Sequence, residues 1–188
     1  MLNDKLFRMA GWCALASALL MVLAMLSFVF AGAAPSAGMV GMTFEVISLL
    51  LLVFVFYALA IAHRAESKWL GFTGMILLVV AIVVDVVSQQ VNSTFFFGLW
   101  YFLFSLPFLI FGYLGFRSNR MPRVLAILAL LAGAIYFIAG IVGWLGAPEL
   151  ADNISSLSIL FVLVWAIWLW RVLLSKKFAD PSPEPVAV

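Results

Sequence analysis

Residues 69–90 read WLGFTGMILLVVAIVVDVVSQQ, an almost unbroken apolar run with one carboxylate, Asp85, near its end. A helix of this length rises about 33 Å, which is enough to cross the hydrocarbon core of a membrane. A strand of a membrane β-barrel would instead alternate apolar and polar residues over about ten positions. The run lacks that alternation, and it therefore predicts a transmembrane α-helix.

Five further apolar runs of similar length accompany this one. The six predicted spans are residues 9–32, 43–62, 69–90, 94–116, 124–145 and 155–174, and short polar breaks separate them. Hydrophobic residues make up 67% of the 188 positions and charged residues only 10%, which excludes an ordinary soluble domain. We predict an all-α, multi-pass membrane protein with one six-helix domain over residues 1–176 and a cytoplasmic tail over residues 177–188.

The basic residues fall entirely on one side of this six-span arrangement. Cytoplasmic loops near the ends of spans collect Lys and Arg, so we predict that both termini face the cytoplasm. The ten basic residues are Lys5, Arg8, Arg64, Lys68, Arg117, Arg120, Arg123, Arg171, Lys176 and Lys177.

Reporter fusions test this orientation. The fusion sites expected outside the cytoplasm follow Ala34, Asn92 and Pro148, and those expected inside follow Lys68, Arg120 and Lys177. A cytoplasmic signal from the reporter at position 92 would contradict the six-span arrangement.

Asp85 is the main candidate for a functional residue. Stepping back from it by helical turns meets Ala81, Gly74 and Gly71, so its side chain is predicted to face the interior of the bundle. An ionised Asp at mid-bilayer costs about 2.5 to 3.5 kcal/mol, and a position near a helix C-terminus disfavours negative charge further. An acid in such a position indicates a functional site.

Glu45, at the start of the second predicted span, is the other main candidate. A short loop joins spans two and three, so both carboxylates are predicted to share the non-cytoplasmic half, which has no Lys or Arg. Two nearby acids repel each other when both are charged, so the pair is predicted to be neutralised by a proton, a bound cation, polar side chains or another protein. The full candidate pocket comprises Asp85, Glu45, Ser48, Ser88, Gln89, Asn92, Asp152, Asn153 and Ser155. The alternative is that Glu45 and Asp152 simply begin helices, where the macrodipole favours an acid.

Small residues at helical spacing predict the faces on which the helices pack. These residues are Gly71, Gly74, Gly98, Ser105, Gly112, Gly133 and Gly140. No catalytic or metal-binding motif is found, and nothing identifies a cofactor. The single histidine, His63, is predicted to be an interfacial loop residue beside Arg64.

A family resemblance rests on the first span and the overall layout. Arg8, Met9, Ala10 and Gly11 precede a long apolar helix, six spans follow, and an acid stands at the head of the second. In these features the chain resembles small bacterial six-helix integral membrane proteins of unknown function. The resemblance covers most of the chain and implies a multi-pass protein of the bacterial inner membrane, but no activity.

Three functions follow from these features. The first is an accessory or interaction subunit of a membrane complex, and the second is a small proton- or cation-coupled transporter or channel using Asp85 and Glu45. The third is a membrane enzyme, which the lack of a recognisable nucleophile and base disfavours, or a binder of lipid or a hydrophobic cofactor. The predicted partners are membrane lipids and other membrane protein subunits, and not nucleic acid.

Overall fold

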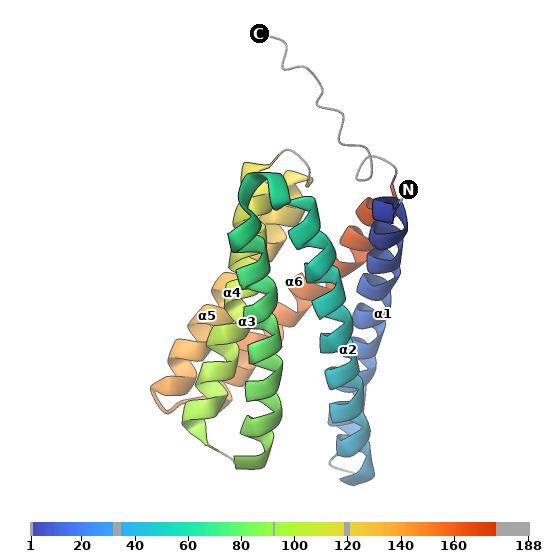
Figure 1. Cartoon of the computed structure of the whole chain (residues 1–188). Coiled ribbons are helices and arrows are strands. Elements are labelled where there is room, and N and C mark those ends of the chain that lie inside the picture. Colours follow the sequence, from blue (N-terminus) through green and yellow to red (C-terminus); the bar gives the residue numbers. More distant parts are fainter. Residues whose placement is uncertain (1, 32–34, 92, 119–120, 176–188) are drawn as a thin grey trace.

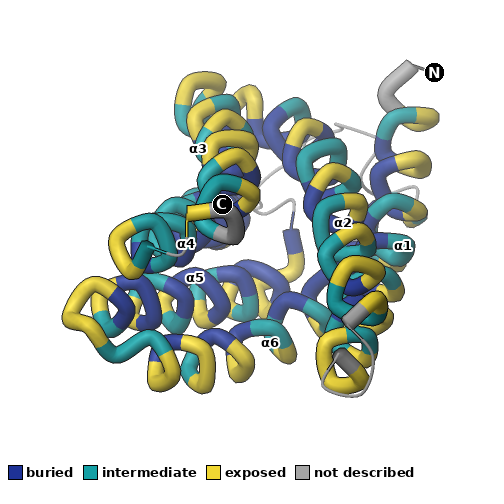
Figure 2. Tube along the Cα trace, turned by 90° about the horizontal axis from the view of Figure 1, so that it is seen from below, coloured by how far each residue is buried: buried dark blue, intermediate teal, exposed yellow. Residues whose placement is uncertain are grey.

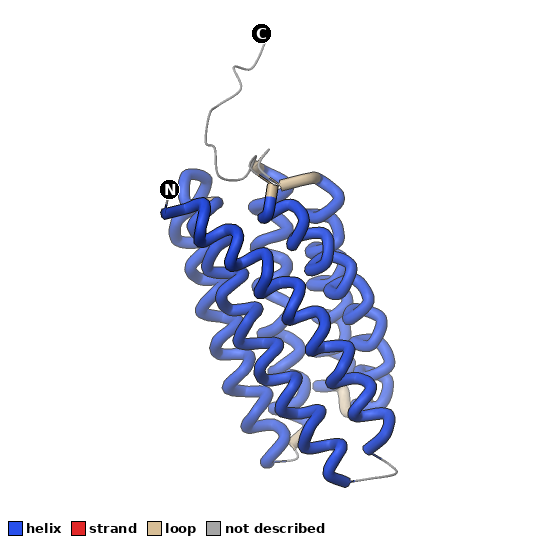
Figure 3. Tube along the Cα trace, turned by 90° about the vertical axis from the view of Figure 1, so that its right-hand side faces the viewer, coloured by secondary structure: helices blue, strands red, loops and turns tan. Residues whose placement is uncertain are grey.

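Six long helices account for nearly all of the chain that the computed structural model describes, which is residues 2–31, 35–91, 93–118 and 121–175 (Figure 1). They are α1 (Leu2–Ala31), α2 (Pro35–Ala62), α3 (Arg64–Val91), α4 (Thr94–Arg117), α5 (Arg123–Trp144) and α6 (Pro148–Leu174). Only helices and short turns occur in these residues, as Figure 3 shows. All six helices are long and apolar enough to cross a membrane. The predicted all-α fold with six spans is confirmed.

The helices form a ring in which each packs against its neighbours in the sequence, and α1 closes the ring against α6. Viewed along the bundle, α1 and α2 lie on one side and α3 and α4 on the other (Figure 2). The seams α2–α3 and α1–α6 are the least extensively packed of the ring. The molecule therefore consists of a helical hairpin, α1–α2, docked on a four-helix unit, α3–α6.

The two ends of the bundle differ in charge. We call the end at which α1 begins and α6 ends the terminal end, and the opposite end the distal end (Figure 1). Every Lys and Arg within the described residues lies near the terminal end. Interior acids of the distal half therefore have no basic side chain close at hand among the described residues.

Several helices begin earlier than the apolar runs that predict them. Helix α2 begins at Pro35 and α6 at Pro148, where the sequence predicted polar breaks. Proline is favoured in the first turn because its fixed φ suits a helix and its missing N–H has no partner there anyway. Glu45 consequently lies ten residues inside α2, about 15 Å from its start. The interpretation that Glu45 begins a helix is wrong, and the macrodipole does not account for this acid.

Helices α4 and α5 approach each other most closely, through glycines. A β-carbon on Gly140 would lie 2.9 Å from the backbone nitrogen of Phe102, and one on Gly112 would lie 2.7 Å from the Leu130 side chain. Close approach of this kind is typical of small residues between membrane helices. The remaining predicted packing residues are also buried: Gly71 against Ala60, Gly74 against Phe111, Gly98 against Trp144, Gly133 against Leu109, and Ser105.

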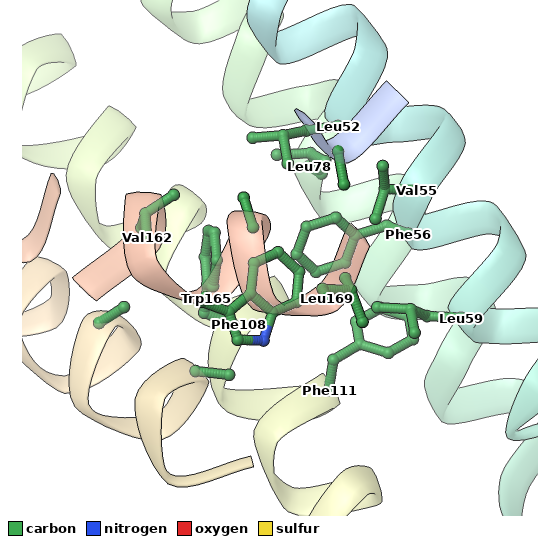
Figure 4. Close-up of a cluster of buried hydrophobic side chains, with 14 of the residues drawn as sticks. Leu52, Val55, Phe56, Leu59, Leu78, Phe108, Phe111, Val162, Trp165 and Leu169 are labelled. Carbon is green, nitrogen blue, oxygen red and sulfur yellow. The ribbon is translucent and has the colours of Figure 1, made fainter. Parts of the chain in front are cut away.

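Aromatic side chains fill the centre of the bundle toward the terminal end. Phe56 of α2 packs edge-on against Phe108 and Phe111 of α4, with ring centroids 5.3 and 4.9 Å apart (Figure 4). Trp165 of α6 lies against Phe56 and Phe108 and is fully buried. Edge-to-face pairs of this kind add to the dispersion energy of the core. This aromatic core separates the distal interior from the terminal end.

His63 is buried inside the terminal end of the bundle. It lies in the turn between α2 and α3, as predicted, and its side chain is fully buried within the protein. Its Nδ1 is 3.1 Å from the hydroxyl of Ser118, which follows α4, and 3.9 Å from a carboxylate oxygen of Glu66. The histidine therefore links the α2–α3 turn to the end of α4.

Candidate functional site

Glu45 and Asp85 come together in the distal half of the bundle. Glu45 extends from α2 and is partly buried, whereas Asp85, six residues before the end of α3, is only 5% exposed. The two carboxylates are close enough to repel each other. They belong to the two structural units of the bundle, so this repulsion acts across the α2–α3 seam.

Tyr136 of α5 extends the cluster toward α6. Its ring is 2% exposed, and its phenol interacts with the hydroxyl of Ser158 and lies within electrostatic range of Glu45. Ser158 is fully buried and also donates a hydrogen bond of 2.8 Å to the backbone carbonyl of Ala132. The phenol therefore connects α6 to the carboxylate on α2.

A second tyrosine, Tyr101 of α4, connects the interior to the distal surface. Its hydroxyl donates a hydrogen bond of 2.6 Å to the carboxylate of Asp152, which is exposed in the second turn of α6. The hydroxyl of Ser155, one turn deeper, donates to the Tyr101 oxygen at 3.1 Å. The buried phenol thus contacts one exposed acid and one buried hydroxyl.

These groups share one face of α6. Asp152, Ser155 and Ser158 recur every third residue, and such positions lie above one another on a helix. Tyr101 meets the first two and Tyr136 the third. Five helices, α2 to α6, therefore contribute polar side chains to one interior region, which we call the polar cluster: Glu45, Asp85, Tyr101, Tyr136, Asp152, Ser155 and Ser158.

The other predicted pocket residues lie elsewhere. Ser48 faces α1, where its hydroxyl lies 2.9 Å from both the hydroxyl and the carbonyl oxygen of Ser17. Ser88 donates a hydrogen bond of 2.7 Å to the backbone carbonyl of Asp85, and Asn153 is exposed. The side chain of Gln89, and Asn92 as a whole, lie outside the described residues.

Sequence reasoning did not find Tyr101 and Tyr136. Tyr101 stands in a run of Phe, Leu and Trp, and Tyr136 stands in a run of Ala, Ile and Phe; both runs predict only lipid-facing or core side chains. The available signal was the phenol itself, because a buried tyrosine hydroxyl normally needs a hydrogen-bonding partner. A tyrosine within a predicted span therefore indicates a polar neighbour on another helix.

The chemistry of the polar cluster is that of oxygen ligands and exchangeable protons. Carboxylates and hydroxyls bind protons or hard cations, and they offer no positively charged group to an anion. Among the described residues, no three His, Cys, Asp or Glu side chains gather as metal ligands do. The cluster therefore offers oxygen ligands and exchangeable protons, and no positive charge.

A hollow at the distal rim lies apart from these residues. It is open, has a volume of about 350 Å³, and is lined by Thr94, Phe95 and Trp144. The indole N–H of Trp144 donates a hydrogen bond of 3.1 Å to the carbonyl of Phe95. The hollow and the polar cluster are separate features of the distal half.

Comparison with known proteins adds no relative from which an activity could be carried over. No family model, no curated protein and no solved structure matches the chain. The chain is therefore characterised by its own architecture, a multi-pass membrane protein of six apolar helices in one bundle.

Proposed function

We propose that the protein is a small cation-coupled membrane transporter in which Glu45 and Asp85 together hold the cation. The observation that supports the proposal is the pair itself, a buried carboxylate on α3 and a partly buried one on α2 that lie within electrostatic range of each other. Acids within membrane spans are costly and typically mark ion or proton pathways. The distal half, which lacks basic residues among those described, favours a bound cation as the neutralising partner.

The position of the pair favours coupling to a conformational change. Without a cation, the two negative charges push the α1–α2 hairpin and the four-helix unit apart at their loosely packed seam. A bound cation removes the repulsion and lets the seam close, so it binds the closed arrangement more tightly. Rocking of one bundle against another around a fixed site is the general mechanism of many secondary transporters.

The proposed orientation places the distal half outside the cytoplasm. The positive-inside distribution of the basic residues supports this assignment, and a bacterial inner membrane fits it. In this orientation the cation enters the polar cluster from outside, because the aromatic core around Phe56 and Trp165 fills the path toward the terminal end.

Reconstitution of the purified protein tests the proposal. In liposomes with an imposed proton or sodium gradient, the parent protein is expected to carry cation flux above that of protein-free liposomes, measured with pH- and sodium-sensitive dyes. Flux that equals the protein-free background under both gradients would contradict the transport function.

An accessory-subunit role is the second candidate, and α1 supports it. This helix is the least buried of the six and exposes large apolar side chains such as Trp12 and Leu19. A membrane partner that copurifies in a fixed ratio and crosslinks to a probe at Leu19 would support this role. A protein that purifies alone and carries flux would exclude it as the main function.

A further inference from the structure

We propose that the outer side of the α1–α6 seam binds an anionic membrane phospholipid at the terminal end, with its phosphate held between Arg8 and Arg171. The site lies at the opposite end of the bundle from the polar cluster. This inference therefore does not depend on the Glu45–Asp85 pair or on the transport function.

Helices α1 and α6 meet through a glycine near the terminal end, where α1 begins beside the end of α6 (Figure 1). A β-carbon on Gly11 would lie 3.2 Å from the carbonyl oxygen of Trp170 and 3.4 Å from the side chain of Leu173. Arg8 stands one turn before Gly11, Arg171 directly follows Trp170, and both arginines are exposed. The two arginines therefore flank one helix contact from its two helices.

Both arginines lie on the outer side of the seam. Beside the same contact, Phe7 of α1 is only 5% exposed and Ala166 of α6 only 1% exposed, so the inner side of the seam is closed by packing. Exposed side chains next to the seam consequently face outward. In a membrane, that outer side meets lipid headgroups and acyl chains.

The exposed stripe of α1 changes in character along its length. Lys5, Arg8, Trp12 and Leu19 follow one another at spacings of three, four and seven residues, which places them on one helical face. Trp12 is 56% exposed and Leu19 is 58% exposed. From the terminal end inward, the stripe is first basic, then amphipathic and then aliphatic. A phospholipid presents its phosphate, its glycerol region and its acyl chains in the same order.

A matching stripe runs along α6. Arg171 lies at the terminal end, and the exposed aliphatic side chains of Ile167 and Val164 follow toward the distal end at spacings of four and three residues. Trp12 and Trp170 join the two stripes, because their ring centroids are 5.8 Å apart across the seam. One lipid can thus place its phosphate between the arginines and an acyl chain along the aliphatic side chains.

The charge at this site favours an anion. Lys5, Arg8 and Arg171 carry positive charges, and Asp4, one turn before Arg8, carries the opposing negative charge. Within the described parts of α1 and α6, no acid forms an ion pair with either arginine. A guanidinium group matches a phosphate with two parallel N–H donors. The remaining positive charge repels the ammonium group of a zwitterionic lipid, so the site prefers a lipid with net negative charge.

The bound lipid would join the two structural units of the bundle. Arg8 belongs to the α1–α2 hairpin and Arg171 to the four-helix unit, and their seam is one of the two least extensively packed. Without an anion between them, the two like charges repel each other. A phosphate removes this repulsion and contacts both units, so its binding is expected to stabilise the docked hairpin.

Native mass spectrometry of the purified protein in detergent tests the site. The protein is titrated with phosphatidylglycerol, or with phosphatidylcholine of the same acyl chains, and peak intensities give the dissociation constant of the first bound lipid. The parent is expected to bind phosphatidylglycerol more tightly than phosphatidylcholine. Arg8→Gln and Arg171→Gln are each expected to weaken the binding of phosphatidylglycerol about fivefold, the effect of one basic residue beside an anionic lipid.

Arg117→Gln is the matched control for these variants. Arg117 is an exposed arginine of the same end, but it lies on α4, across the ring from α1 (Figure 2). This variant is expected to keep the parent affinity, and Arg8→Lys, which keeps the charge, should lose less affinity than Arg8→Gln. Thermal unfolding in detergent gives a second readout. Phosphatidylglycerol is expected to raise the unfolding midpoint of the parent and of Arg117→Gln more than that of Arg8→Gln.

Four results would overturn the site as proposed. Equal weakening in Arg8→Gln, Arg171→Gln and Arg117→Gln would show that anionic lipids bind diffusely over the whole terminal end. Equal affinity of the parent for the two lipids would refute the preference for negative charge. Displacement of phosphatidylglycerol by an equal concentration of glycerol phosphate, which has no acyl chains, would assign the site to a free phosphate compound. A copurifying protein that crosslinks to a probe at Trp12 and prevents lipid binding would assign this face to a protein partner.

Discussion

The variant Asp85→Asn is expected to reduce cation-coupled flux in liposomes to the protein-free background while the six-helix bundle stays folded. Asparagine is nearly the same size as aspartate and retains its hydrogen-bonding oxygen, but it neither binds a proton at neutral pH nor carries the charge that repels Glu45. The hairpin and the four-helix unit then lose the charge that drives their separation. The measurement is the initial rate of dye response in liposomes with equal amounts of parent and variant protein.

Glu149→Gln is the matched control for this experiment. Glu149 is an acid of the same distal end, exposed in the first turn of α6, and it is not a member of the polar cluster. We expect this variant to transport at the parent rate. Asp85→Asn should also melt no earlier than the parent, because it removes a charge that is costly to bury. Equal flux in Asp85→Asn and the parent would show that Asp85 does not hold the transported cation.

The fold could be predicted from the sequence because the membrane allows so few solutions. In hydrocarbon every backbone N–H and C=O must be satisfied within the protein, so an apolar run as long as residues 69–90 is a helix. The helix starts were harder to predict. Residues 35–42 contain Pro, Ser and Gly, which usually indicate a break, yet here the proline begins α2 and the helix continues through the small residues. That extension of two turns changed the interpretation of Glu45.

The candidate site could be predicted only in part, for a similar reason. Helical spacing to Ala81, Gly74 and Gly71 was enough to place Asp85 on a buried face, because that argument stays within one helix. The partners of Tyr101 and Tyr136 are on α6, and their pairing depends on how α4, α5 and α6 are placed around the ring. Periodicity within a span carries no information about contacts of that kind. Ser48, one turn after Glu45 in α2, was predicted to belong to the same pocket, but its hydroxyl lies against Ser17 of α1.

The largest expected effect on stability comes from Gly140→Leu in the α4–α5 contact. A β-carbon at Gly140 would lie 2.9 Å from the nitrogen of Phe102 and 3.1 Å from the carbonyl oxygen of Gly98. Overpacking a close-packed core costs about 1–3 kcal/mol and occasionally more. The atoms in the way here are backbone atoms of α4, so a change of rotamer cannot relieve the clash and the two helices must move apart. We therefore expect a loss at or above the upper end of this range, measured as a lower midpoint of thermal unfolding in detergent.

Two further substitutions on α5 make this prediction specific. Ala134→Leu adds a side chain of comparable size to an exposed position of the same helix, and it is expected to melt with the parent. Gly133→Leu should fall between the two, because the first atoms in its way belong to the side chain of Leu109, at 2.8 Å, with the Leu109 nitrogen at 3.0 Å. If Gly140→Leu and Ala134→Leu both unfold at the same temperature as the parent, then Gly140 faces lipid and is not part of the contact between α4 and α5. We expect destabilisation to increase in the order Ala134→Leu, Gly133→Leu, Gly140→Leu. In this order the backbone of α4 comes closer to the substituted position. Helices α4 and α5 carry both tyrosines, so Gly140→Leu should also disturb the hydrogen bond between Tyr101 and Asp152, whereas Ala134→Leu should leave it in place.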